Sequence, residues 1–263
     1  MLDLTPLQYG LGGGSGALVG FVLGLVGGGG SILAVPLLMY LVGLSNPHQA
    51  IGTGALAVAV NAAGGLWNHA RGGTVNWRCG GIYAAAGVVG ALGGSTLGKN
   101  IDGHKLLLLF ALLMIAIAIV MFRARGNPGV EGAQCNRDNV GKVISYGFGT
   151  GAFSGFFGIG GGFLIVPGLV ASTSMPILRA IGTSLVAVTA FGLTTALNYA
   201  ASGLVNWPLA GIFILGGILG SVLGTRASRN LSARKGTLNT VFAVFVLLVA
   251  FYMLYHSWLA LRG

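Results

Sequence analysis

The stretch Gly27-Gly28-Gly29-Gly30-Ser31-Ile32-Leu33-Ala34-Val35-Pro36 interrupts a run of sequence that is apolar on both sides. The pattern returns 131 residues later, at 158–167, as Gly158-Ile159-Gly160-Gly161-Gly162-Phe163-Leu164-Ile165-Val166-Pro167. Backbone groups released from helical hydrogen bonds cost several kcal/mol each in hydrocarbon, so such breaks persist only inside protein or beside a water-filled cavity. Two matched breaks in apolar sequence therefore predict a ligand-binding site between two related halves of the chain.

The composition indicates that the chain is embedded in a membrane. Of its 263 residues, 54% are hydrophobic and only 7% are charged, and its mean hydropathy is +0.86. A soluble domain carries about 25% charged residues, so we expect an all-α polytopic membrane protein. Most of the 49 glycines are explained by the close helix packing that small residues permit in membranes.

The net charge of +10 comes from 14 Lys and Arg residues against 4 Asp and Glu residues. The basic residues lie in short loops between apolar segments, which is typical of topology signals and lipid-headgroup contacts rather than of nucleic-acid binding. Cys79 and Cys135 lie far apart in the sequence, and we expect neither a disulfide framework nor a metal site from them. The N-terminus lacks the basic region and cleavage site of a removable signal peptide.

Short motifs recur at a spacing of 130 or 131 residues, which predicts two tandem repeats. Ala50-Ile51-Gly52-Thr53 matches Ala180-Ile181-Gly182-Thr183, and Val75-Asn76-Trp77 matches Val205-Asn206-Trp207. The expected parts are a first membrane repeat at 1–122, a polar linker at 123–142 and a second membrane repeat at 143–263. Each repeat has four apolar segments, at 11–44, 50–68, 79–98 and 104–122, and at 143–173, 180–200, 208–225 and 236–259.

The distribution of positive charge predicts that the second repeat is inverted relative to the first. If each glycine break lies in a hairpin that enters and leaves on one side, the 14 Lys and Arg residues divide eleven against three. If each break segment crosses the membrane instead, they divide seven against seven. Cytoplasmic loops are enriched in Lys and Arg. We therefore expect the linker and residues 69–78, 173–179 and 226–235 in the cytoplasm, with both chain ends outside.

Segment length also favours a hairpin at the start of each repeat. Residues 11–26 and 31–44 would span only ~24 Å and ~21 Å as helices, short of a membrane core of ~30 Å. We expect each hairpin to be broken at its glycines, with a new helix beginning at about Ser31 or Phe163. Inverted repeats with broken helices near the membrane centre are a recurrent plan of transporters.

The glycine breaks themselves are the first candidates for substrate binding. A helix start leaves backbone N–H groups unpaired and carries partial positive charge, and glycine lets an anion approach the main chain closely. The alternative, that the glycines only permit tight helix crossing, stays open. The candidate residues are Gly28, Gly29, Gly30, Ser31, Gly160, Gly161 and Gly162.

Polar side chains within the second segments are further candidates. Thr53 and Thr183 follow the two breaks at matching positions, and the second choices are Asn61, Asn68 and Asn198. Each could instead form only hydrogen bonds between helices. Arg179, at the cytoplasmic mouth, could attract an anion or serve as an ordinary topology signal.

All four acidic residues (Asp3, Asp102, Glu131, Asp138) lie in loops or termini. A buried carboxylate is the usual means of holding a cation or relaying a proton in a membrane, so we expect no cationic substrate. Proton coupling would then fall to His48, His69 or His104, each of which is more simply explained as an interfacial residue. The chain has no phosphate-binding loop, no metal-binding pattern and no nucleophile–base pair, so we expect no cofactor and no enzyme.

With these residues, the chain resembles the TauE/SafE family of sulfite-exporter-like membrane proteins from about residue 15 to 256. The resemblance rests on the two glycine motifs at 27–36 and 158–167, on Ala-Ile-Gly-Thr at 50–53 and 180–183, and on the two Val-Asn-Trp motifs. It implies transport of small sulfur-containing anions, such as sulfite, sulfoacetate or related organosulfonates, across the bacterial inner membrane.

The function predicted from the sequence is a secondary transporter, in the direction of export, for a sulfite-like or organosulfonate anion bound at the paired breaks. One repeat would rock against the other to expose the site alternately. The alternatives are an anion channel of the same architecture and a membrane scaffold subunit that transports nothing. Besides the substrate and membrane lipids we expect no nucleic-acid partner, and a homodimer stays open.

Overall fold

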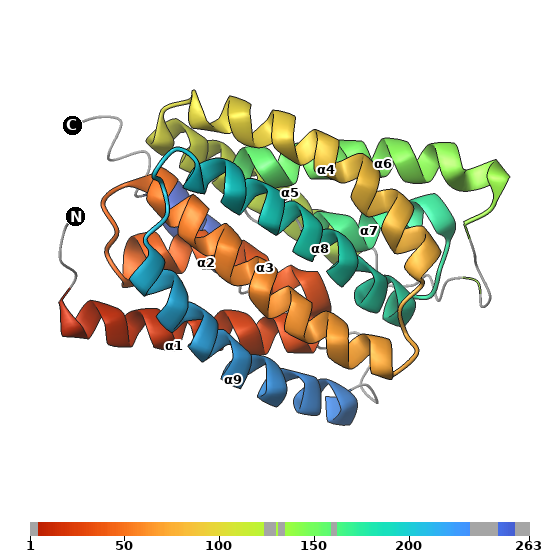
Figure 1. The fold of residues 1–263 in the computed structure, drawn as a ribbon, viewed down its shortest axis with the longest axis horizontal. Helices are drawn as coiled ribbons and strands as arrows, with labels where there is room; N and C mark the ends of the chain where they lie inside the picture. The colour runs from red at the N-terminus through yellow and green to blue at the C-terminus, as the bar shows by residue number, and fades with distance from the viewer. Residues whose placement is uncertain (1–4, 124–129, 131–134, 159–161, 232–246, 256–263) are drawn as a thin grey trace.

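The computed structural model describes residues 5–123, 130, 135–158, 162–231 and 247–255, and every regular element in them is helical. This confirms the all-α prediction (Figure 1). The α-helices are α1 (Pro6–Val26), α2 (Ala34–Pro36), α3 (Pro47–Arg71), α4 (Trp77–Lys99), α5 (Gly103–Arg123), α6 (Arg137–Phe157), α7 (Gly162–Thr173), α8 (Ile177–Ala200) and α9 (Trp207–Leu231). A 3-10 helix, η1 (Gly27–Leu33), precedes α2, and a π-helical turn, η2 (Leu37–Leu41), follows it.

Four helices among the described residues are long and apolar enough to cross a membrane. They are Pro47–Arg71, Trp77–Lys99, Arg179–Ala200 and Trp207–Gly224. Shorter apolar helices lie at Gly30–Leu41, Lys105–Ala116 and Gly162–Thr173. The chain is therefore a multi-pass membrane protein, as its composition predicts.

Backbone contact at glycine holds together the two helix pairs that share the most extensive contact. Helix α1 packs along α9, and α4 packs along α6. A Cβ atom added to Gly20 would collide with the backbone of Gly217, and one added to Gly151 would collide with the backbone of Gly87. Because small residues let membrane helices approach this closely, much of the glycine content is explained by these two pairs.

The contacts along the helices also show in which direction each packed helix runs relative to its neighbour. Helices α3 and α8 run antiparallel, because Gly52 lies against Tyr199 whereas Gly65 lies against Leu185. Helix α1 runs parallel to α9, and α4 runs parallel to α6. The contacts that give these parallel directions are Gly16 with Phe213 and Gly20 with Gly217, and Gly147 with Tyr83 and Gly155 with Ala91.

The first hairpin differs in length from the prediction. Helix α1 has 21 residues and reaches about 31 Å, so the prediction of a short first arm at 11–26 is wrong. The helix begins earlier because Pro6 occupies its first turn, where the missing N–H has no helical partner to lose. The chain still turns back, since a Cβ atom on Gly30 would lie 2.8 Å from the carbonyl oxygen of Val19 on α1.

The second arm of this hairpin is irregular. The α-helix predicted from about Ser31 does not begin there, because 3-10 geometry continues to Leu33. Glycine is a poor α-helix former, and Pro36 clashes with the preceding turn and cannot donate a backbone hydrogen bond. In the second repeat α7 begins at Gly162, as predicted within one residue, and spans only 12 residues.

The asparagines of the two Val-Asn-Trp motifs are helix caps. The Asn76 side chain accepts a hydrogen bond from the backbone N–H of Cys79 at the start of α4. The Asn206 side chain accepts one from the backbone N–H of Leu209 at the start of α9. Asn is among the preferred N-cap residues because its side-chain oxygen pairs an otherwise free N–H of the first turn. The motif therefore marks a helix start.

Cys79 and Cys135 form a disulfide, with their Cα atoms 5.4 Å apart. The expectation that these cysteines carry no disulfide is therefore wrong. They are 56 residues apart in the sequence, but the parallel packing of α4 and α6 brings the starts of both helices together. The bond ties the first turn of α4 to the residues just before α6.

Candidate functional site

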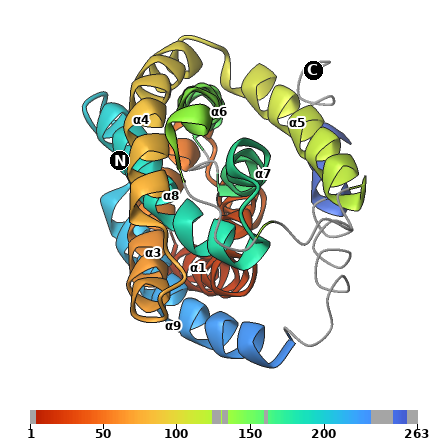
Figure 2. The same ribbon diagram turned by 90° about the vertical axis from the view of Figure 1, so that its right-hand side faces the viewer.

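The two glycine breaks approach each other inside the bundle. Helix α7 contacts η1, and α8 contacts both of them; Figure 2 shows α7 between α1 and α6. Gly30, Ser31 and Gly162 are buried, so these parts of the breaks face protein rather than lipid. Gly28 and Gly29 belong to η1, whereas Gly160 and Gly161 lie outside the described residues.

The end of α6 shows why glycine is needed before the second break. Gly158 caps α6 with a left-handed backbone, φ 65°, which side chains other than glycine rarely adopt. Its Cα also lies against Ile51 of α3, where an added Cβ atom would collide with the isoleucine side chain. The second hairpin therefore turns directly beside the first repeat.

Asn61, a candidate from the sequence, differs from the other buried polar side chains of the described residues because two of its polar atoms lack a partner, whereas five other residues each leave one. Its side chain is 2% exposed, and neither amide atom has a hydrogen-bond partner within the described part of the chain. It lies against the backbone of Gly217 on α9. Leaving a buried polar group unpaired costs about 1–3 kcal/mol, and such groups are rare enough in native proteins to call for an explanation.

Asn61 lies at the depth of the first glycine break. On the same helix, a Cβ atom on Gly54 would contact Ala34 and Leu38 of the hairpin's second arm at 3.5 and 3.3 Å. Asn61 is seven residues beyond Gly54, which is about two turns along the same helix face. Helix α3 follows this arm after a short loop and runs back along it. The stretch of the arm that lies level with Asn61 is therefore earlier in the sequence than Ala34, at about Gly27–Ser31.

Thr53 and Thr183 make the same contact in opposite repeats. Thr183 Oγ1 accepts a hydrogen bond from the backbone N–H of Asn76 at 2.9 Å, and Thr53 Oγ1 accepts one from the backbone N–H of Asn206 at 3.0 Å. Both threonines are fully buried. These bonds join each Gly-Thr motif to the Val-Asn-Trp motif of the other repeat. A role for either hydroxyl toward a substrate stays a prediction.

Asn68 and Asn198 match in sequence but not in surroundings. Asn68 is exposed. Asn198 is half-buried, and its Oδ1 accepts a hydrogen bond from Lys99 Nζ at 2.7 Å. The Asn198 amide also donates to Ser95 and Thr96 of α4. The structure gives Asn198 a set of partners that the sequence does not predict, and its role toward a substrate also stays a prediction.

Two of the three candidate histidines hold loops at helix ends. His48 Nε2 lies 3.1 Å from the carbonyl oxygen of Ile101, and His69 Nδ1 lies 2.9 Å from Thr74 Oγ1. The side chain of His104 lies outside what the structure describes. No group of three His, Cys, Asp or Glu side chains that could hold a metal ion occurs among the described residues.

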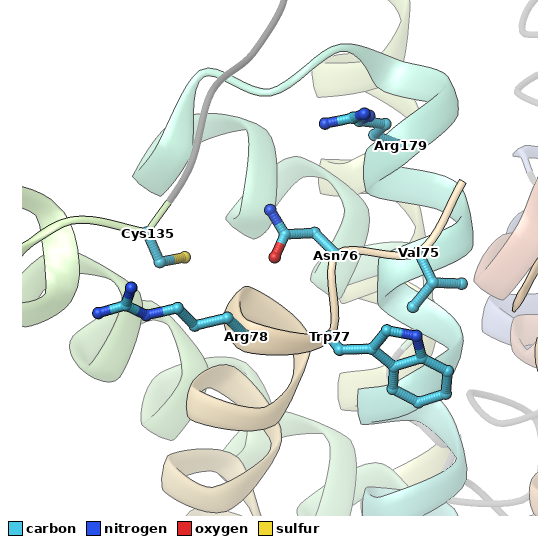
Figure 3. A pocket seen from close by; sticks show the side chains of 6 residues that line it. All are labelled: Val75, Asn76, Trp77, Arg78, Cys135 and Arg179. Carbon is cyan, nitrogen blue, oxygen red and sulfur yellow. The ribbon is translucent and has the colours of Figure 1, made fainter. Parts of the chain in front are cut away.

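A cavity of about 310 Å³ opens at the end of the molecule where α4 and α8 begin (Figure 3). The residues that line it are Val75, Asn76, Trp77, Arg78, Cys135 and Arg179. The sequence singles out Arg179 at this mouth but not Arg78 or Cys135. The sequence does contain a sign that Arg78 is special. The residue after the first Val-Asn-Trp motif is Arg78, whereas the residue after the second is Pro208.

Comparison with known proteins identifies the family of the chain. The model of the family described as sulfite exporter TauE/SafE matches residues 13–253. A probable membrane transporter protein of Xylella fastidiosa (strain Temecula1) is 55% identical over 249 residues, covering 94% of this chain and 95% of the relative. The probable membrane transporter protein YunE of Bacillus subtilis is 26% identical, covering 92% and 96%. No solved structure matches the chain at a significant level. The chain is a membrane transporter rather than an enzyme, and it belongs to the TauE/SafE sulfite exporter family.

Proposed function

We propose that this transporter exports a small sulfur-containing anion, such as sulfite or an organosulfonate, across the bacterial inner membrane. The observation that carries the proposal is the buried amide of Asn61, which has no hydrogen-bond partner among the described residues and lies at the depth of the first glycine break. Its Nδ2 group can donate two hydrogen bonds to an oxyanion. A bound anion would pair a group that otherwise destabilises the interior.

The backbone of the breaks would supply further donors. Gly28–Ser31 lie at the depth of Asn61, and Gly162 begins the short helix α7, whose N-terminus carries partial positive charge. None of the four acidic residues lies in a predicted membrane segment, so no carboxylate there would repel the anion. This supports an anionic rather than a cationic substrate.

We further propose that the two repeats are inverted and that mixed helix pairs move as the rigid units. Equivalent helices run in opposite directions, since α3 is antiparallel to α8 whereas α1 and α6 run with α9 and α4. The tightest backbone contacts join helices of different repeats, α1 with α9 and α4 with α6. We expect these pairs to rock about α3 and α8, where the Thr53 and Thr183 bonds lie.

The test is flux in vesicles that contain only the purified protein. Vesicles loaded with sulfite are diluted into sulfite-free buffer, and efflux is compared with that of empty liposomes and with loads of sulfate, chloride and taurine. We expect saturable efflux of sulfite or an organosulfonate, and acceleration by the same anion on the opposite side. The Asn61→Leu variant tests the amide, because leucine keeps the same branched side-chain skeleton and removes the polar atoms.

Each alternative gives a distinct result in this assay. Efflux that is linear with concentration and shows no counter-flow would identify an anion channel and contradict the transporter proposal. Efflux no faster than that of empty liposomes for every anion, together with a stably co-purified partner, would support the scaffold. Saturable flux of an anion without sulfur would keep the transporter and overturn the substrate class.

A further inference from the structure

The cavity at the starts of α4 and α8 is lined by two guanidinium groups and one amide, and none of the described residues that line it is acidic. Arg78 and Arg179 line the cavity and are exposed. A planar guanidinium binds oxyanions through paired N–H groups and stays charged at every physiological pH. The volume of about 310 Å³ is at the small end of ligand pockets, which suits a compact anion.

The contacts between the repeats place these donors around one space. The backbone N–H of Asn76 donates to Thr183 Oγ1, and Thr183 lies one turn beyond Arg179 on α8, so the loop before α4 is held beneath Arg179. The Asn76 Oδ1 atom is occupied by the N–H of Cys79. Its amide nitrogen points toward the space between Arg179 and Cys135 in Figure 3.

The disulfide attaches one wall of this cavity covalently to α4. Cys135 lines the cavity and is bonded to Cys79, the residue after Arg78. The wall before α6 therefore stays attached to the helix that carries Arg78. Both α4 and α8 begin at this cavity, and the partial positive charge of their N-termini adds to that of the guanidinium groups.

The equivalent place in the other half lacks these charges. Pro208 stands where Arg78 stands, and Gln49 stands where Arg179 stands. A general excess of positive charge on one membrane face explains why arginines occur near the cavity, but not why two of them share it with an amide. Arg71, at the same end of the molecule, instead lies over the Trp67 ring, with its Cζ atom 4.7 Å from the ring centroid.

We propose that the Arg78–Arg179 cavity is an entrance site that binds the sulfite or sulfonate oxyanion at the membrane face before the anion reaches the central breaks. The proposal rests on the proposed function for the identity of the anion. The two sites have different roles. The entrance concentrates anions from solution through full charges, whereas the centre releases them readily because it uses only amides.

Arginine protection tests the site on the unaltered protein. Phenylglyoxal modifies exposed arginines, and the modified fraction of Arg71, Arg78 and Arg179 is read by peptide mass spectrometry. Methanesulfonate is the probe, since sulfite adds to the carbonyl groups of the reagent, and chloride at equal ionic strength is the reference. We expect methanesulfonate to slow modification of Arg78 and Arg179 several-fold and to leave Arg71 unchanged, because Arg71 lies outside the cavity.

Flux measurements then separate the entrance from the proposed function. In vesicles, R78Q/R179Q should raise the KM for the anion about tenfold, as expected for the loss of hydrogen bonds to a charged group, whereas R71Q should not. Equal protection of all three arginines, or an unchanged KM in R78Q/R179Q, would overturn the entrance site and leave the transporter intact. Selective protection in a protein that moves no sulfite or sulfonate would keep the site and reject the proposed function.

Discussion

Asn61 and Phe191 occupy matching positions of the two repeats, 130 residues apart, and each lies against a glycine on a helix of the other repeat. Phe191 lies against Gly87, is fully buried, and stacks with Tyr83 at a ring-centroid distance of 6.4 Å. Asn61 lies against Gly217 and has no hydrogen-bond partner among the described residues. The backbone arrangement is shared, but one half fills the place with a packed ring and the other with an unpaired amide.

The two matching positions therefore share a backbone contact without sharing chemistry. The ring stabilises its half through apolar burial, whereas the amide costs its half stability unless a ligand pairs it. The disulfide is a second difference between the halves. Cys79 of the first repeat is bonded to Cys135, whereas Leu209 stands at the matching position of the second repeat. At this pair of positions the first repeat therefore carries a group that could bind a ligand, and the second carries a packing group.

The strongest predicted effect concerns the sidedness of the two repeats. Arg71 and Ala201 are exposed at matching ends of α3 and α8. In inverted repeats, cysteines introduced at these two positions lie on opposite membrane faces. Arg71→Cys should therefore react with an impermeant thiol reagent only from the cytoplasm, and Ala201→Cys only from outside. Labelling of both from one face would reject the inversion.

The same experiment decides between two observations that favour opposite orientations. The charge distribution places the Cys79 end of the molecule in the cytoplasm, but disulfides form and persist mainly in oxidising compartments outside it. Labelling of Arg71→Cys from outside would show that the disulfide, not the charge count, gives the orientation.

The second predicted effect is the contribution of the Cys79–Cys135 disulfide to stability. Replacing both cysteines by serine should lower the free energy of unfolding by about 2–4 kcal/mol, because the link closes a long loop. The measurement is thermal unfolding in detergent with and without reductant. The wild-type protein should lose stability on reduction, and the Cys79→Ser/Cys135→Ser variant should not respond. Two free thiols in the oxidised wild-type protein would contradict the disulfide.

The third prediction compares the two matching positions directly. Asn61→Leu should raise the melting temperature, because it removes an unpaired amide, and should lower flux about tenfold to a hundredfold, since a hydrogen bond to a charged ligand contributes about 1.5–3 kcal/mol. Phe191→Leu should lower the melting temperature, because it loses ring packing, and should leave the KM unchanged. Wild-type flux in the Asn61→Leu variant would remove Asn61 from the substrate site.

The weakest predicted effect concerns the reciprocal threonine bonds. Thr53→Val and Thr183→Val should each destabilise the protein by about 1 kcal/mol, because each removes one hydrogen bond of similar geometry. Thr189→Val is the matched control, since Thr189 bonds the Leu185 carbonyl of its own helix. Equal effects of the first two variants on stability, with little change in flux, support a purely structural role. A loss of flux well beyond the loss of folded protein would support the substrate role predicted from the sequence.

The local elements were predictable because their signals are local. Apolar runs at 79–98 and 180–200 correspond to α4 and α8, since hydropathy over about twenty residues is enough to predict a spanning helix. The Asn-Trp pairs begin helices as cap and anchor residues. The early start of α1 was missed because the apolar run begins only at residue 11 whereas the helix begins at Pro6.

The candidate site was predictable only in part. The sequence identifies Asn61, Gly30 and Ser31 as polar or flexible positions within apolar segments, but not that the amide is left unpaired. A pairing state depends on which residue faces it, and here that residue is Gly217, 156 positions away. The entrance cavity was missed for the same reason, because its two arginines lie on different helices.

Composition and short patterns were enough to establish the membrane class, the two glycine breaks and the repeated motifs, because these are properties of neighbouring residues. The three-dimensional packing was needed to show that each Gly-Thr motif bonds the Val-Asn-Trp motif of the other repeat and that two distant cysteines are joined. Those contacts depend on how α3, α4, α6, α8 and α9 pack against one another, and packing brings together residues that no short stretch of sequence relates.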